Sequence, residues 1–224
     1  GWGLLHAVKV ACEYQQRELA GARVAIQGFG AVGKHAARFL AEEGAIIVAA
    51  ADIRGTVSCA DGLDVAQLVA LKETDGNVID YPDGPGVNKG DAESIIDVNC
   101  DIWIPAARPD VIREDNVNRL QTAMVVSGAN IPMTPGAEEI LHERGVLCIP
   151  DFIANAGGVI CAAMEYHGAS EAAAMDIIAE KLTYNVRRVL DIVRSDNCTP
   201  RQAAEDMAHR RVRRAMALRR WSLF

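Results

Sequence analysis

Apolar residues in this chain gather in short, uninterrupted runs in which polar and apolar positions do not alternate. Runs typical of strands lie at residues 24–27, 45–51, 102–104, 123–127 and 146–149. A strand that is apolar on both sides is covered on both faces of its sheet, as is usual in parallel sheets. We therefore predict an α/β fold, with a mainly parallel sheet and helices on each face.

Helical patterns separate and follow these predicted strands. The patterns predict helices at residues 32–43, 64–73, 114–120, 135–144, 159–167, 170–194 and 200–220, the last two being long C-terminal helices. Thr134 and Thr199 each precede a proline, and Gln202 forms a capping box with Thr199; both features are typical of helix starts. Residues 75–90 are rich in Gly, Pro, Asn and Asp, so we expect an exposed connecting loop there.

The first predicted strand runs directly into three regularly spaced glycines, Gly28, Gly30 and Gly33. Gly28 allows a tight turn, Gly30 lets the backbone approach a pyrophosphate, and Gly33 lets the next helix pack closely. The diphosphate would lie against the free N–H groups that begin this helix. Together the strand, glycines and helix indicate a Rossmann-type, doubly wound fold. The other residues of the predicted cofactor-binding turn are Phe29, Ala31 and Val32.

An acidic residue, Asp52, ends the second predicted strand and is followed by Ile53. Asp52 lies at the ~20-residue offset where a carboxylate accepts hydrogen bonds from the adenosine ribose, which favours NAD and places Asp52 and Ile53 in the predicted site. Arg54 keeps NADP open, because a guanidinium there can pair with a 2′-phosphate. A further alternative is that Asp52 only caps the turn after the strand.

Composition and charge restrict the classes of function. The chain has 224 residues, half of them hydrophobic, and a net charge of −7, which opposes a general nucleic-acid role. We interpret the arginines at 210–214 and 219–220 as a solvated helix face. No run is long enough to cross a membrane, and no secretory pattern begins the chain, so we expect no membrane partner.

Cysteine and histidine residues show no spacing typical of metal sites. The cysteines stand singly, so we interpret them as reduced thiols of a cytoplasmic protein, without disulfides or zinc; they are Cys12, Cys59, Cys100, Cys148, Cys161 and Cys198. The histidines are assigned to helix surfaces or to the edge of the core; they are His6, His35, His142, His167 and His209.

Three later segments carry a family resemblance. They are Ile104-Pro-Ala-Ala107, Val126-Ser-Gly-Ala-Asn130 with Thr134-Pro135 after it, and Ile149-Pro-Asp-Phe-Ile-Ala-Asn155-Ala-Gly-Gly-Val159. In this order and at these separations, the chain resembles the C-terminal, NAD(P)-binding domain of the glutamate/leucine/phenylalanine/valine dehydrogenase family, above all its glutamate dehydrogenase members. The resemblance covers nearly the whole chain.

The resemblance implies roles for several residues. Ala106 and Ala107 would line the nicotinamide ribose, and the amides of Asn130 and Asn155 would hydrogen-bond the nicotinamide half of the cofactor. An amide suits this role because it both donates and accepts. On the residues alone, either asparagine is equally well a helix cap or the centre of a left-handed turn.

Two positions depart from the family pattern. Val159 and Ala162 would face the substrate, yet glutamate dehydrogenases usually have a serine at the place of Ala162, where its hydroxyl helps to hold the substrate carboxylate. Alanine donates no such hydrogen bond, which weakens the case for glutamate by roughly 1.5–3 kcal/mol. Branched-chain members carry an apolar residue there. Ala31 replaces an asparagine of many relatives, which puts one cofactor contact in doubt.

The family's reaction is NAD(P)-dependent oxidation of an L-amino acid to a 2-oxo acid and ammonia. Relatives supply the catalytic lysine and aspartate from an N-terminal domain, and this chain begins at a segment, Gly1-x-Gly3, that resembles the interdomain hinge. No lysine of this chain takes that role. We interpret all of them as surface residues; they are Lys9, Lys34, Lys72, Lys89 and Lys181. We expect cofactor binding without turnover, no catalytic residue in this chain, and substrate contact through the missing domain.

The expected organisation has three parts. Residues 1–20 would form the hinge and leading helix, 21–168 the dinucleotide-binding domain, and 169–224 helices on or beside it. The resemblance implies that the complete protein is a homo-oligomer, a hexamer. An alternative is a non-catalytic NAD-sensing module. A 2-hydroxy acid dehydrogenase is a weaker alternative, because Arg108 has no obvious partner of the required kind.

Overall fold

The computed structural model describes residues 1–218, which contain one seven-stranded sheet of order β4-β3-β2-β1-β5-β6-β7. Its strands are β1 (Arg23–Gln27), β2 (Ile46–Asp52), β3 (Gly55–Cys59), β4 (Val87–Gly90), β5 (Ile102–Pro105), β6 (Met124–Val126) and β7 (Leu147–Ile149). The pairs from β2 through β1, β5, β6 and β7 are parallel. At one side of the sheet, β3 and β4 are antiparallel to their neighbours and were not predicted.

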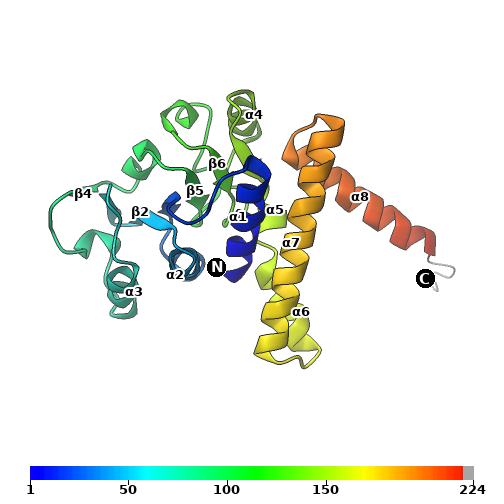
Figure 1. Cartoon of the computed structure of the whole chain (residues 1–224), viewed down its shortest axis with the longest axis horizontal. Helices are drawn as coiled ribbons and strands as arrows, with labels where there is room; N and C mark the ends of the chain where they lie inside the picture. Colours follow the sequence, from blue (N-terminus) through cyan, green and yellow to red (C-terminus); the bar gives the residue numbers. More distant parts are fainter. Residues whose placement is uncertain (219–224) are drawn as a thin grey trace.

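Eight α-helices and three short 3-10 helices accompany the sheet in the described residues. The α-helices are α1 (Trp2–Gln15), α2 (Ala31–Glu42), α3 (Val65–Glu73), α4 (Pro135–Glu143), α5 (Asp151–Ala154), α6 (Gly157–Tyr166), α7 (Glu171–Asp196) and α8 (Pro200–Leu218). The 3-10 helices are η1 (Val78–Asp80), η2 (Ser94–Asp97) and η3 (Val117–Arg119). The long helix α7 runs beside α1, whereas α8 extends away from the body (Figure 1).

Both faces of the sheet are buried, as the continuous apolar runs predicted. In β5, Ile102 and Ile104 join the core beneath α1, α2 and α7, whereas Trp103 joins the core beneath η2, η3 and α4. Helices thus cover the sheet on two sides, because successive side chains of a strand point to opposite faces. The predicted α/β, Rossmann-type, doubly wound fold is confirmed, with its two long C-terminal helices.

The caps predicted for two helices are present. The Thr134 side chain accepts a hydrogen bond from the Ala137 N–H at the start of α4. At the start of α8, Thr199 accepts from the Gln202 N–H, and the Gln202 side chain accepts from the Thr199 N–H, completing the capping box. Of the helix predicted to residue 220, Arg219 and Arg220 lie outside the described residues.

Two predictions about local structure are wrong. Residues 114–120 form turns and η3, because the Asn116 side chain accepts from the Arg113 N–H at 2.8 Å and donates to the Val111 carbonyl at 3.0 Å. A side chain that binds nearby backbone competes with the helix. Residues 75–90 are more than a connecting loop, because they contain η1, whose Val78 is buried, and strand β4.

Candidate functional site

The candidate site lies where the chain changes direction across the sheet. From β1 the chain crosses to β2 on one side, and it later returns to β5 on the other side. Backbone bonds continue the ladder beyond the strand ends: the Gly28 N–H donates to the Ala51 carbonyl, and the Ala106 N–H donates to the Gln27 carbonyl. Such a switch point opens a crevice at the carboxyl edge of a doubly wound sheet.

The glycine turn has the geometry that its spacing predicted. Gly28 has φ +98°, and a Cβ there would lie 2.6 Å from the Cβ of Ala107, so only glycine fits. A Cβ on Gly33 would collide with the carbonyl oxygen of Gly28, which shows how closely α2 packs against the turn. By contrast, a Cβ on Gly30 would meet nothing within 4 Å. The backbone at Gly30 is therefore open to a ligand.

The start of α2 presents free backbone donors. Gly30 is the N-cap and provides no side-chain cap, and the first helical bond runs from the Lys34 N–H to the Gly30 carbonyl. In residues 1–218, the N–H groups of Ala31, Val32 and Gly33 have no acceptor. Free N–H groups and the positive end of a helix dipole favour an anion.

A groove of about 650 Å³ opens beside this turn, a volume typical of small-molecule sites. It gathers predicted residues from three loops, namely Gly28, Phe29, Gly30, Asp52, Ile53, Ala106 and Ala107. Sequence reasoning missed its other lining residues, which are Gln27, Lys72, Ala92, Glu93 and Arg108. The buried Oε1 atom of Gln27 has no hydrogen-bond partner among the described residues. The lining of the groove includes two acidic side chains, Asp52 and Glu93, and two basic ones, Lys72 and Arg108.

Asp52 is held by three donors inside the protein. Its Oδ1 accepts from the Arg54 N–H at 2.9 Å, and its Oδ2 accepts from the Val78 N–H at 2.9 Å and from Lys72 Nζ at 3.0 Å. The Asp52 and Lys72 side chains are only 8% and 22% exposed. Burial alone would raise the pKa of Asp52, but the Val78 and Arg54 hydrogen bonds and Lys72 lower it below the ordinary value. The turn-capping role is thus present, and a negative charge is retained.

The Asp52 contacts correct two predictions. Lys72 is not a solvated surface residue, because it is paired with Asp52 and lines the groove. The segment 75–90 contributes to the site, because the Val78 N–H holds the carboxylate. Lys72 lies 20 residues from Asp52 in sequence, and no local pattern indicates this pairing.

The predicted asparagines lie together, outside the groove itself. The side-chain amide of Asn155 donates to the side-chain oxygen of Asn130 at 2.7 Å. The loop that carries Asn130 adjoins the groove, because the N–H groups of Gly128 and Ala129 both donate to the Pro105 carbonyl. This places the amide pair beyond Ala106, on the side of the groove away from Asp52.

The two residues expected to face a substrate lie on α6. Val159 is 76% exposed, and Ala162 is also exposed. No residue of α6 is buried, although the helix is rich in apolar residues. Neither side chain lines the groove beside the glycine turn.

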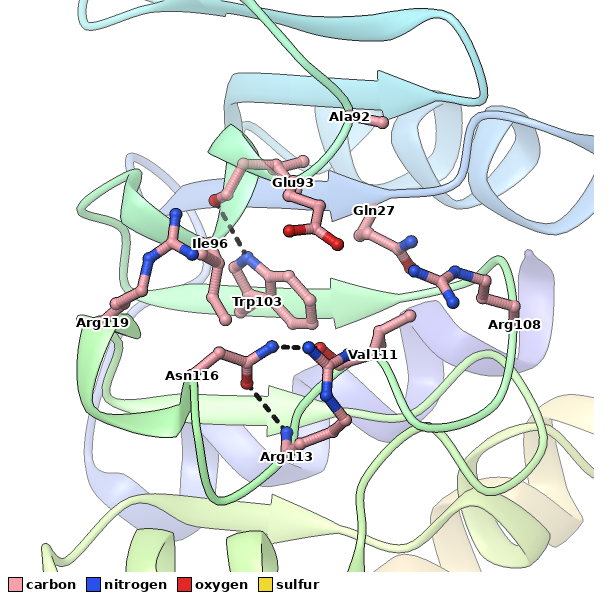
Figure 2. A pocket seen from close by; sticks show the side chains of 11 residues that line it. Gln27, Ala92, Glu93, Ile96, Trp103, Arg108, Val111, Arg113, Asn116 and Arg119 are labelled. Carbon is pink, nitrogen blue, oxygen red and sulfur yellow. Dashed lines mark hydrogen bonds between the residues drawn. The ribbon is translucent and has the colours of Figure 1, made fainter.

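A second, much smaller cavity lies next to the groove and shares Gln27, Glu93 and Arg108 with it. Figure 2 shows Trp103 within this cavity and Arg108 reaching toward Gln27. Its volume of about 30 Å³ matches roughly two water molecules. This cavity is too small for a cofactor ring, and the larger groove is therefore the candidate binding site.

The remaining candidate groups do not form a second reactive centre in residues 1–218. All six cysteines are free. His6 lies at the edge of the core and His35, His142 and His209 lie on helix surfaces, as predicted, whereas His167 is the C-cap of α6. Within the same range no cluster of His, Cys, Asp and Glu is placed to hold a metal. None of the described helices has the length and apolar character needed to span a bilayer.

Comparison with known sequences gives consistent matches. A family model described as glutamate/leucine/phenylalanine/valine dehydrogenase matches residues 1–220. Glutamate dehydrogenase of Aeropyrum pernix is 36% identical over 231 residues, which cover 99% of this chain and 54% of that protein. NADP-specific glutamate dehydrogenase of Saccharolobus shibatae is 43% identical over 146 residues, which cover 65% of this chain and 34% of that protein.

Solved structures show the same arrangement. Hetero-hexameric glutamate dehydrogenase of Thermus thermophilus, with leucine bound, superposes with a TM-score of 0.85 at 25% identity, covering 98% of this chain and 53% of that one. L-tryptophan dehydrogenase of Nostoc punctiforme shares the fold, with a TM-score of 0.75 at 22% identity and coverage of 96% and 59%. The chain thus spans about half the length of these relatives.

Proposed function

Because this chain belongs to the glutamate/leucine/phenylalanine/valine dehydrogenase family, we propose that it is the NAD(P)-binding part of an amino acid dehydrogenase. One observation carries the proposal: the free N–H groups at the start of α2 and the unobstructed backbone of Gly30 lie together beside a groove of about 650 Å³. This combination fits a dinucleotide, because the pyrophosphate needs both donors and close approach. Residues 21–168 would form the cofactor-binding domain, with 1–20 as hinge and leading helix and 169–224 as helices on or beside it.

We propose the following roles for the residues of the site. The turn Gly28–Gly33 would hold the pyrophosphate, and Ala106 and Ala107 would leave room for the nicotinamide ribose. Asn130 and Asn155 would hydrogen-bond the nicotinamide half, since their amides already meet at 2.7 Å and retain further donors and acceptors. Asp52 and Ile53 would border the adenosine ribose.

The proposed reaction is the family's oxidative deamination. The bound nicotinamide would accept a hydride from the α-carbon of an L-amino acid, and hydrolysis of the imine would release a 2-oxo acid and ammonia. This chain would orient the cofactor and, through Val159 and Ala162, border the substrate. Ala162 offers no hydroxyl to a substrate carboxylate, so the proposal names the class of L-amino acids rather than glutamate.

The proposed cofactor is NAD, with NADP as the alternative. The lowered pKa of Asp52 keeps the carboxylate charged, and a 2′-phosphate near it would be repelled. Lys72 lies 3.0 Å from that carboxylate and offsets part of the repulsion. The Saccharolobus shibatae relative is NADP-specific, which shows that the family includes NADP enzymes.

Further proposals concern the complete protein. Its catalytic lysine and aspartate would come from chain beyond these 224 residues, so the present chain would bind cofactor without turnover. The complete protein would be oligomeric, as the hexameric Thermus thermophilus relative is. Six free thiols support a cytoplasmic location, because reducing conditions keep thiols unpaired.

Calorimetric titration of the chain with NAD and with NADP tests the proposed function. We expect NAD to bind more tightly, and Asp52→Ala to lose about 1–3 kcal/mol of NAD affinity, so that the difference between the two cofactors narrows. Asp115→Ala is the matched control, because Asp115 is an exposed carboxylate that pairs with Arg113. If neither NAD nor NADP binds the chain, the proposal is refuted.

A further inference from the structure

Arg201, in the first turn of α8, joins two buried carboxylates from other elements. Its Nε lies 2.5 Å from Oε2 of Glu138 on α4, and its Nη2 lies 3.4 Å from Oδ1 of Asp151 on α5. The Glu138 and Asp151 side chains are 8% and 10% exposed, and that of Arg201 is 29% exposed. One guanidinium therefore binds α8 to the two helices that follow β6 and β7.

Asp151 extends this contact to both loops that carry the site asparagines. Its Oδ2 accepts from the Ile131 N–H at 2.8 Å, directly after Asn130. Its backbone carbonyl accepts from the Asn155 N–H at 2.8 Å. Ile131 has φ +48°, a left-handed conformation that a β-branched residue rarely adopts, so the surrounding contacts must hold it there. Asp151 thus fixes the backbone next to each asparagine.

The asparagine side chains in turn meet each other, with the amide of Asn155 donating to the oxygen of Asn130 at 2.7 Å. A continuous set of contacts therefore runs from Arg201 through Asp151 to the amide pair. Arg201 does not line the groove beside the glycine turn, so any effect on a cofactor there passes through Asp151. Its fork of donors suits this arrangement, because a planar guanidinium can bind two carboxylates in fixed directions and an ammonium cannot.

We infer that Arg201 is a positioning residue for the nicotinamide half of the cofactor site, acting through Asp151 on the orientation of Asn130 and Asn155. This inference rests on the proposed function, because it requires a dinucleotide in the groove. It assigns α8 a role in cofactor geometry, although most of that helix extends away from the sheet (Figure 1). The adenosine half of the site would not depend on Arg201, because no contact connects it to Asp52 or Lys72 in the described residues.

The test compares two ligands that differ only by the nicotinamide: NADH and ADP-ribose. Arg201→Lys keeps the charge but not the two-carboxylate fork, and Arg201→Gln removes the charge. For both variants of the whole chain we expect the dissociation constant of ADP-ribose to stay within twofold, while NADH affinity falls about tenfold. The fluorescence anisotropy of bound NADH should fall as well. Arg187→Gln is the control, because Arg187 makes an exposed pair with Glu13 on the surface of α7.

The double variant Glu138→Gln with Arg201→Gln covers the case in which a single variant does not fold, because it leaves no unpaired carboxylate on α4. The same selective loss of NADH is expected there. Equal losses for NADH and ADP-ribose, or no loss for either, would overturn the inference. The inference would also be overturned if the wild-type chain bound NADH no more tightly than ADP-ribose. Failure of the proposed function is distinguishable, because wild-type chain would then bind neither ligand.

Discussion

Two carboxylates at opposite sides of the site are held in similar ways. Asp52 ends β2 and accepts from two backbone N–H groups and from Lys72. Asp151 follows β7 and accepts from the Ile131 N–H and from Arg201. Each is at most 10% exposed, and each joins a strand end to a helix distant in sequence. Both carboxylates therefore use a cation to fix a loop at the carboxyl edge.

The two carboxylates differ in where their cations lie relative to the groove. Lys72 lines the groove and belongs to the surface that a ligand would contact. Arg201 lies outside the groove lining and has a second buried partner, Glu138. We infer that the cation at the adenosine side takes part in ligand choice, whereas the cation at the nicotinamide side maintains the shape of the loops. The two cations should then differ in what their removal changes.

Removal of Arg201 should have the largest effect on stability. Arg201→Ala leaves the buried Glu138 and Asp151 without their cation, and loss of one partner from a buried pair is worth about 3–5 kcal/mol. Urea unfolding followed by circular dichroism measures this loss. Arg187→Ala should change stability by less than about 1 kcal/mol, because its pair with Glu13 is exposed. Similar losses of stability in the two variants would contradict the structural role of Arg201.

Asp52 should give the adenosine side a pH dependence of intermediate size. Because its pKa is lowered in the folded state, its stabilisation is complete above the ordinary carboxyl pKa of 3.8 and disappears as pH falls through the lower folded value. Asp52→Asn should therefore be less stable than wild type by roughly 1–3 kcal/mol at neutral pH. In urea unfolding from pH 7 to pH 2, this difference should shrink only below about pH 4. A constant difference throughout would show that Asp52 is not the titrating group.

The glycine turn and the helix caps at Thr134 and Thr199 were predictable because their causes are local. Gly28 must adopt positive φ, and Thr199 and Gln202 lie within one helical turn of each other. Contacts between residues distant in sequence left no local pattern from which to predict them. Lys72 and Asp52 are 20 residues apart, and Arg201 and Asp151 are 50 apart, so their pairing depends on how the helices pack. The wrong helix at 114–120 has a local cause, since the Asn116 side chain binds backbone in place of the helix.

The short antiparallel edge was missed for a different reason. Strand β3 (Gly55–Cys59) contains Gly, Thr and Ser, and β4 (Val87–Gly90) exposes its two central residues, so neither forms the uninterrupted apolar run that marked the parallel strands. Strand β3 follows a hairpin at Asp52, where Asp52 pairs with Gly55 in the ladder, and β4 then pairs with β3. The same hairpin brings the Arg54 N–H to the carboxylate. Asp52 thus also contacts the turn that leads into β3.

Lys72 should have the smallest effect, and one on ligand choice more than on stability. Lys72→Met removes the ammonium 3.0 Å from Asp52 and leaves that carboxylate two backbone donors, so we expect the fold to persist. Without the cation, Asp52 would repel a 2′-phosphate more strongly, and NADP affinity should fall roughly fivefold, about 1 kcal/mol, with NAD little changed. Paired titrations with NAD and NADP measure the ratio, with Lys181→Met on α7 as the control. An equal loss for both cofactors would mean that Lys72, like Arg201, serves only to hold a loop.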